Sequence, residues 1–138
     1  MPVITERLNI KTRGFNDIID ITREVSKIVA QHNVGDAQVM VYVAGSTASI
    51  TTIEYEPGLL KDLPEALENI APMNKTYHHD EKWHDGNGYA HLRASIIGNS
   101  QSFPVHNGEI VLGTWQQIVI IDFDNKPRTR GVFVQIIY

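Results

Sequence analysis

The stretch from Trp115 to Tyr138 reads WQQIVIIDFDNKPRTRGVFVQIIY, and it decides the fold class of this chain. Residues 115–123 and 131–138 are rich in β-branched and aromatic residues, which predicts two strands. The segment between them begins DNKP at residues 124–127, and these residue types favour a turn. The C-terminal part of the chain is therefore predicted to be β-sheet.

Short strands and turns extend backward from this stretch, and helices are predicted before it. Further strands are expected at 3–12, 37–44, 48–54, 102–106 and 109–112. Helices are expected at about 20–33, 61–70 and 89–97. The first helix places Ile21, Val25 and Ile28 on one face, and the carboxylate of Asp20 can cap its start. Helices grouped early and strands grouped late favour an α+β fold with mostly antiparallel pairing.

Length and composition predict one globular domain over residues 1–138. Hydrophobic residues make up 42% of the chain and charged residues 20%, which is far from the composition of a disordered protein. A domain of this length buries roughly two-thirds of the surface that its unfolded chain exposes. A single core is therefore expected.

Charge and hydropathy argue against several classes of partner. The net charge is -4 and no lysine- or arginine-rich run is present, so nucleic acid is not an expected partner. The longest apolar runs, such as 118–121, are far shorter than the ~20 residues that cross a bilayer, so no membrane association is expected. The N-terminus lacks a signal-peptide pattern, which predicts a cytoplasmic protein. The absence of cysteine excludes disulfides, thiolate metal sites and thiol catalysis.

Several motifs in the C-terminal half occur together in one order. They are YHHD at 77–80, DGNGYAHL at 85–92, IGNS at 97–100, LGTWQQ at 112–117 and PRTR at 127–130. The N-terminal half adds DIT at 20–22 and STA at 46–48, which leads to Glu54. In order and spacing these motifs resemble the YjbQ-like family over essentially the whole chain. Members of that family are commonly labelled secondary thiamine-phosphate synthases.

The resemblance implies a fold, an assembly and an activity. The implied fold is α+β, with mostly antiparallel sheets in sandwich-like packing and about three helices. The implied assembly is a homotrimer, and the apolar strand from Phe133 to Tyr138 agrees with it because a bare strand edge promotes association. The implied reaction joins a pyrimidine diphosphate to a thiazole phosphate, so the expected partner is a small phosphorylated molecule.

Histidines and acidic residues after the second predicted helix form the predicted catalytic and metal-binding site. Residues 72–88 lack an apolar period and are predicted to be a long loop. The resemblance implies that His79 and His91 line a pocket, act as catalytic residues and, with Asp85, bind a divalent metal ion such as zinc or magnesium. The histidine spacing alone matches no standard zinc signature and also suits solvated loop histidines.

Two positions differ from the histidines that the family typically has. They are Gly45 and Tyr89 in this chain. Borderline metal ions take three or four nitrogen or oxygen ligands. His79 and His91 therefore need further ligands from Asp80, Asp85 or a neighbouring subunit.

A second group of residues is predicted to bind the phosphorylated substrate. Arg128 and Arg130 alternate along an extended segment and point to the same side, where two guanidiniums can bind a phosphate. Ion pairs with Asp122 or Glu109 are the alternative interpretation. Hydroxyl and amide groups complete the predicted set, namely Ser100, Thr47 and Gln116.

Three functions are compatible with these residues. The first is a weak thiamine-phosphate synthase, in which the paired arginines bind the diphosphate and the two histidines stabilise its departure. The second is a non-catalytic anion- or metal-binding trimer whose metal site is depleted at Gly45 and Tyr89. The third is metal-dependent hydrolysis of a small phosphate or lactone.

Overall fold

A computed structural model describes residues 1–138 as an α+β fold of eight strands and four helices. In chain order these are β1 (Val3–Thr12), β2 (Asp17–Asp20), α1 (Thr22–His32), β3 (Ala37–Val43), β4 (Ala48–Ile53), α2 (Pro57–Ile70), α3 (His78–Trp83), α4 (Gly88–Ile97), β5 (Ser100–His106), β6 (Glu109–Ile110), β7 (Gln117–Asp122) and β8 (Arg128–Ile137). All strand pairs are antiparallel. The predicted fold class is confirmed, with one helix more than expected.

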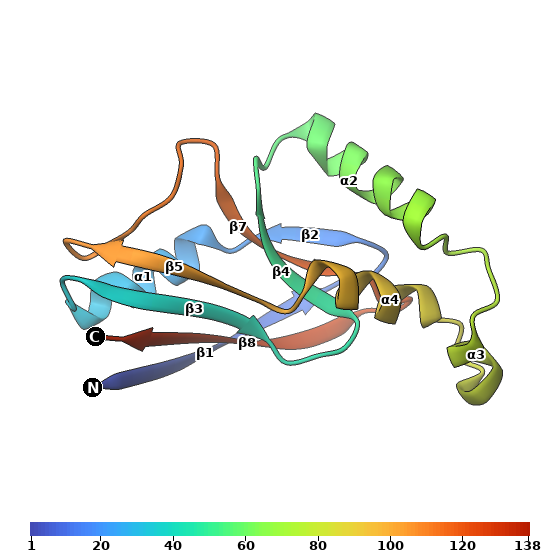
Figure 1. Ribbon diagram of the computed structural model, residues 1–138, viewed down its shortest axis with the longest axis horizontal. Helices are drawn as coiled ribbons and strands as arrows, with labels where there is room; N and C mark the ends of the chain where they lie inside the picture. Colours follow the sequence, from blue (N-terminus) through green and yellow to red (C-terminus); the bar gives the residue numbers. More distant parts are fainter.

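The strands form two sheets, and the smaller sheet lies between the larger one and two helices. The larger sheet has the order β1-β8-β3-β5-β6, and the smaller has the order β2-β7-β4. Side chains of both sheets and of α1 pack into one core, whereas α2 and α4 pack on the other face of the smaller sheet. Figure 1 shows α1 and these two helices lying at different ends of the sheets.

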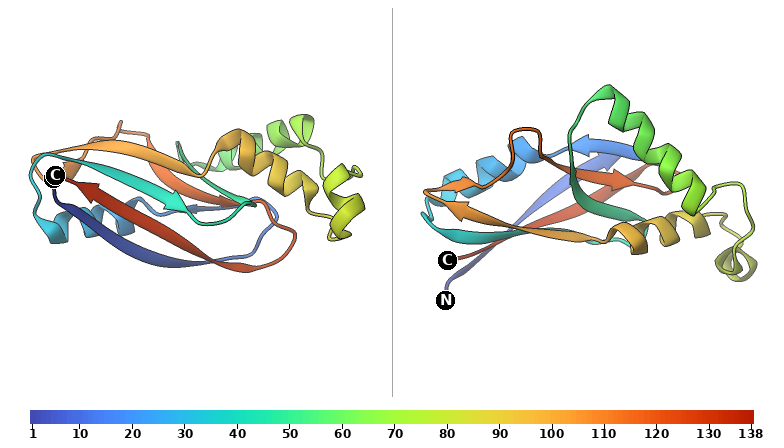
Figure 2. Two further views of the ribbon diagram at one scale, coloured as in Figure 1. Left: turned by 60° about the horizontal axis from the view of Figure 1, so that its bottom comes forward. Right: turned by 45° about the horizontal axis from the view of Figure 1, so that its top comes forward.

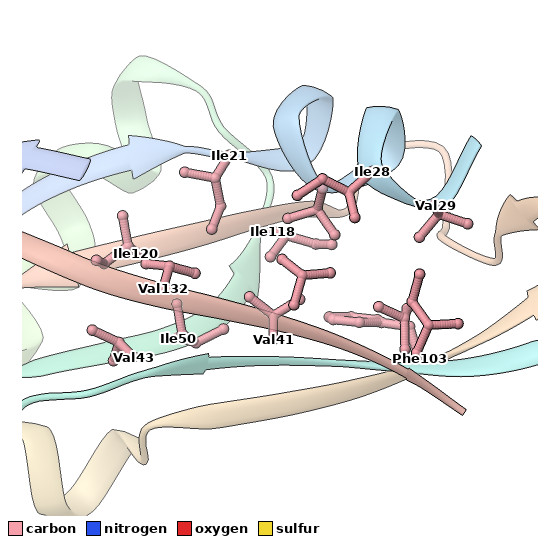
Figure 3. Packing of buried hydrophobic residues seen from close by; sticks show 14 of the residues in the cluster. Ile21, Ile28, Val29, Val41, Val43, Ile50, Phe103, Ile118, Ile120 and Val132 are labelled. Carbon is pink, nitrogen blue, oxygen red and sulfur yellow. The ribbon is translucent and has the colours of Figure 1, made fainter. Parts of the chain in front are cut away.

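Strand β7 fixes this arrangement because both of its faces are buried. Ile118 and Ile120 point into the core between the sheets, as Figure 3 shows. Val119 and Ile121 point to the opposite side, against α2 and α4. A strand buried on both faces carries a continuous apolar run instead of an alternating one. Each of these side chains is fully buried, which stabilises the fold by about 1.5–3 kcal/mol per residue.

Helix α1 follows the apolar period that its sequence predicts. Val25, Ile28 and Val29 are buried against the core. The Asp20 carboxylate accepts hydrogen bonds from the amide and the hydroxyl of Thr22, at 3.0 and 2.6 Å. Asp20 therefore satisfies one orphan amide of the first turn, as expected, from a position just outside the helix.

Three elements differ from the sequence-based expectations. Helix α2 begins at Pro57, because Pro57 suits a first helical position and the Glu56 carboxylate accepts hydrogen bonds from the amides of Gly58 and Leu59. The sequence pattern does not indicate β2, which has only four residues. Helix α3 lies within the expected loop, and it has no buried residue and hence no apolar period.

The last strand, β8, is not at an edge of its sheet. The argument that a bare edge from Phe133 to Tyr138 favours association is therefore wrong. β8 pairs with β1 on one side and with β3 on the other. Its backbone groups are satisfied on both sides over the stretch that begins at Phe133. The outer strands of the larger sheet are β1 and β6.

The two ends of the molecule are built from different elements. The chain termini lie together at one end, and α2, α3 and α4 gather at the other in all three views (Figures 1 and 2). The loop between β3 and β4 also reaches the helical end (Figure 1). None of the four helices has the length and hydrophobicity that crossing a bilayer requires.

Candidate functional site

A cavity lies at the helical end, bordered by the β3–β4 loop, α3 and α4. Its volume is about 720 Å³, within the range of small-molecule sites. Among the residues that line it are Gly45, Ser46, His79, Gly88, His91 and Ser95. The two histidines expected in a pocket, His79 and His91, are therefore brought together.

Helix α4 presents His91 to the cavity because of its helical spacing. Gly88, His91 and Ser95 are three and four residues apart, so they share one face, and all three line the cavity. Tyr89 and Arg93 are buried on another face of the same helix, with exposures of 1% and 0%. Tyr89 packs in the core between the smaller sheet and α2. Position 89, where the family typically has a histidine, therefore faces that core and not the cavity.

The start of α3 is fixed against the start of α4. Asp80 accepts hydrogen bonds from the amides of Gly88 (2.9 Å) and Tyr77 (3.2 Å). A Cβ on Gly88 would come within 2.7 Å of the Tyr77 Cβ, so glycine permits this close approach. Burial alone would raise the pKa of Asp80, but the two amides and the nearby His79 ring together hold its pKa below the usual value. The carboxylate is charged at neutral pH.

His79 and His91 stack on each other beside two carboxylates. Their ring centroids are 4.3 Å apart and their planes are inclined by 36°. The Nδ1 of His79 lies 3.5 Å from an oxygen of Asp80 and 3.5 Å from an oxygen of Asp85. These separations are at the outer limit of hydrogen bonding, and this buried nitrogen has no formed hydrogen bond.

His91 is held in its neutral form. Burial lowers its pKa, and the neighbouring His79 lowers it further, against the opposing effect of Asp85, Asp124 and Asp80. A neutral imidazole can accept a hydrogen bond or coordinate a metal ion.

The surroundings of His79 fit a divalent metal ion. Ligand atoms of His79, Asp80 and Asp85 all lie within 4.8 Å of one another. Two ligands of a tetrahedral zinc ion are about 3.4 Å apart when each bond is about 2.0–2.1 Å long. The 3.5 Å separations at His79 agree with that value. A mixture of imidazole and carboxylate suits zinc better than magnesium, which favours oxygen ligands.

The three side chains that could hold a cation overlap only in part with the set expected from the sequence. Asp85 joins His79 as expected, and Asp80 is the third member. His91 stays outside the group of ligand atoms, because it lies against the face of the His79 ring. Its place is therefore on the cavity wall, next to the group and not in it.

The two arginines do not line the cavity, although they share one side of β8 as expected. Arg130 is buried, and its Nε and Nη2 donate to the two oxygens of Asp122 at 2.7 and 2.9 Å. Arg128 donates from Nε to Asp124 at 2.9 Å. A buried carboxylate needs a charged partner, and both aspartates are fully buried. The ion-pair interpretation with Asp122 therefore describes Arg130.

The remaining predicted substrate ligands lie in three different places. Thr47 is buried, donates to Asp124 at 3.1 Å and accepts from Arg130 at 2.6 Å. Ser100 is exposed at the start of β5, next to the cavity-lining Asn99. Gln116 donates to Thr52 and accepts from the Gly113 amide, at the opposite end of β4 from the cavity. These residues do not converge on one site within the chain.

The relationships of this chain to known proteins agree with its fold. Residues 6–138 match the sequence profile of a family described as UPF0047 protein YjbQ-like. The chain belongs to the YjbQ-like family. One YjbQ-like relative, a UPF0047 protein from Archaeoglobus fulgidus, is 42% identical over 128 residues, which cover 93% of this chain and 97% of the relative. Another, the UPF0047 protein YugU from Bacillus subtilis, is 35% identical over 129 residues, which cover 93% of this chain and 95% of the relative.

Crystal structures of YjbQ-like proteins share the fold. A protein from Sulfolobus solfataricus, described as YbjQ-like and of unknown function, superposes with a TM-score of 0.92 at 30% identity, covering 98% of this chain and 96% of its own. A member from Clostridium acetobutylicum gives a TM-score of 0.86 at 38% identity, covering 96% and 99%. The YjbQ-like fold is thereby confirmed, and the family remains one of unknown function.

Two buried aspartates lie behind the cavity of this YjbQ-like chain, and of these the sequence pattern indicates only Asp122, as an ion-pair partner of the arginines. Asp124 accepts from the side chains of Thr47, Asn87 and Arg128, and thereby connects the β3–β4 loop to the start of α4. Burial would raise the pKa of Asp124, but hydrogen bonds from Asn87, the Asn125 amide and Arg128 keep its pKa below the usual value. The sequence contains a signal for this pairing, because Asp122 and Asp124 are two residues apart at and just beyond the end of β7, as Arg128 and Arg130 are two residues apart at the start of β8.

Proposed function

We propose that this YjbQ-like protein binds a divalent cation at His79, Asp80 and Asp85 and acts on a small phosphorylated substrate in the same cavity. One observation carries the proposal, namely the buried Nδ1 of His79, which has no hydrogen-bond partner and lies 3.5 Å from two carboxylate oxygens. A buried nitrogen without a partner is unfavourable, and coordination to a cation removes that penalty.

The residues around the cavity have separate roles in this proposal. A bound zinc or magnesium ion supplies positive charge for a departing phosphate or diphosphate. Asp80 fixes α3 against α4 through the Gly88 amide and so holds the His79 imidazole at the cavity wall. His91 stacks on that imidazole and, in its neutral form, offers a ring nitrogen to the substrate.

The family resemblance supports a more specific reaction. We propose a slow thiamine-phosphate synthase activity, in which a pyrimidine diphosphate is joined to a thiazole phosphate, in a cytoplasmic homotrimer. Purified protein with zinc or magnesium and both substrates should form thiamine phosphate. Absence of product at high enzyme concentration would refute the reaction. Light scattering should give three times the 15.5 kDa mass of the chain.

Zinc titration tests the cation site directly. Calorimetry at pH 7.5 should show binding by the wild-type protein, and the affinity should fall at least about tenfold in His79→Ala and in Asp85→Asn. The control is His106→Ala, because His106 pairs with Asp36 far from the cavity lining. Equal zinc affinity in all four proteins would show that the cation does not bind at His79.

A binding role without catalysis is the second candidate. It is favoured by Gly45 and Tyr89, which stand where the family typically has histidines, and by the burial of Tyr89 in the core. In that case the protein should bind zinc and inorganic phosphate and yet form no product from the two thiamine precursors. Product formation that is lost in His79→Ala would exclude this candidate.

A further inference from the structure

The β3–β4 loop carries hydrogen-bond donors that have no partner in the chain. The backbone amides of Gly45 and Ser46 make no hydrogen bond, although the preceding Ala44 amide donates to Gly131 and Thr47 accepts from the Phe123 amide. Gly45 and Ser46 both line the cavity. Two unpaired amides therefore lie in succession at one cavity wall.

The side chain of Arg130 does not itself line the cavity, but it lies directly behind the lining residue Gly45. Its Nε and Nη2 are held by Asp122, and Nη2 also donates to the Thr47 hydroxyl at 2.6 Å. Its third nitrogen, Nη1, has no hydrogen bond and lies 2.7 Å from the position that a Cβ on Gly45 would occupy. The side chain is 9% exposed, and Nη1 itself retains some access to solvent.

The absence of a side chain at Gly45 leaves Nη1 uncovered on the side that faces the β3–β4 loop. With Arg130 placed as it is in this chain, a Cβ at position 45 would lie 2.7 Å from Nη1, so the guanidinium would have to shift against the three hydrogen bonds that fix its plane. Gly45 has no left-handed φ, so alanine is conformationally allowed there. The close contact is therefore the main effect of a substitution.

We propose that Gly45, Ser46 and Arg130 form an oxyanion subsite that binds a phosphate group of the substrate. Successive backbone amides beside a guanidinium nitrogen are a common arrangement for binding phosphate oxygens. Arg130 is already paired with Asp122, so the subsite supplies directed donors and little net charge. The inference rests on the proposed function in placing the substrate in this cavity, and it adds the residues that recognise the phosphate.

Titration of the full-length protein with inorganic phosphate tests the subsite. Each protein is titrated once after treatment with a chelator and once with zinc present. In both conditions Gly45→Ala should bind phosphate about tenfold or more weakly than the wild-type protein. Gly113→Ala is the matched control, because a Cβ there meets no atom closer than 3.6 Å and Gly113 does not line the cavity. Its phosphate affinity should equal that of the wild-type protein. Gly45→Ala should still bind zinc.

The outcomes separate the subsite from the cation site. Phosphate binding that is unchanged in a folded Gly45→Ala variant would overturn the subsite, whatever happens with zinc. Phosphate binding that depends on Gly45 in a protein without zinc affinity would support the subsite and refute the cation site. If Gly45→Ala does not fold, a wild-type crystal soaked in tungstate decides. Density within hydrogen-bonding distance of Arg130 Nη1 supports the proposal, and density elsewhere in the cavity or none overturns it.

Discussion

Replacing Arg130 by methionine should lower the free energy of unfolding by about 3–5 kcal/mol. The guanidinium makes two hydrogen bonds to Asp122 and one to Thr47. Asp122 is fully buried, and without the arginine it keeps only the Thr12 hydroxyl and the Asp124 amide as donors. Removing one partner of a buried ion pair is costly because the other charge is left unpaired in the interior. A domain has about 5–15 kcal/mol of stability, so the variant keeps part of it.

Arg128→Met is the matched control for this prediction. The Arg128 side chain is 39% exposed and makes one hydrogen bond to Asp124, which retains Thr47, Asn87 and Asn125 as donors. Partly exposed pairs contribute little because solvent screens them, so the expected loss is below about 1 kcal/mol. Two arginines that are two residues apart should therefore differ several-fold in their contribution to stability.

The assay is urea unfolding followed by circular dichroism at pH 7, with chelator present in every sample. Equal losses in the two variants would refute the reasoning. So would a loss below about 1 kcal/mol in Arg130→Met, since it would show that Asp122 does not depend on the arginine. Arg130 would then be free to bind substrate with its whole guanidinium, as its sequence pattern suggests.

Three further predictions concern the helical end of the molecule. The pKa of His91 is lowered on folding, so the stability that neutral His91 contributes is present above about pH 6.5 and is lost as the pH falls. Chemical unfolding of His91→Ala should therefore show a flatter dependence of stability on pH between about pH 6.5 and 5. The pKa values of Asp80 and Asp124 are also lowered, so stability should fall as the pH drops below about 4, and less steeply in Asp124→Asn. In Gly88→Ala the new Cβ would meet the Tyr77 Cβ at 2.7 Å, which should cost about 1–3 kcal/mol in urea unfolding and weaken zinc binding. An unchanged pH profile in the first two variants, or an unchanged unfolding midpoint in the third, would contradict these assignments.

The elements with strong periodicity could be predicted from the sequence. Helix α1 has buried residues at the spacing of one helical face, and the apolar run of β7 at 118–121 marks a strand whose two faces are both buried. Helix α3 could not be found in this way, because its sequence HHDEKW buries nothing and its start is fixed by Asp80 through local hydrogen bonds. The start of α2 depended on the Glu56 carboxylate, which the apolar pattern does not show.

The candidate site was predicted less completely, because the sequence does not show what each side chain faces in the folded chain. Alternation along β8 places Arg128 and Arg130 on one side, but it does not say whether that side is a cavity or a buried wall. The register of β4 with β7 pairs Ala48 with Asp122 and Ile53 with Gln117, which puts Gln116 at the far end of the sheet. Such a register is a long-range property that a motif in the sequence does not contain.

The lack of buried residues in α3 has a consequence for any ligand of the cavity. Detaching α3 would expose little apolar surface, so we expect this helix to open at a free energy below that of global unfolding. His79 and Asp80 belong to α3, so the apparent affinity of the proposed cation site would be the intrinsic affinity multiplied by the fraction of molecules in which the helix is docked. Cation binding at the proposed site would then be coupled to the docking of α3, and amide hydrogen exchange in residues 78–83 should slow when zinc is added. A substitution that loosens α3 without removing a ligand atom then weakens binding through this equilibrium alone.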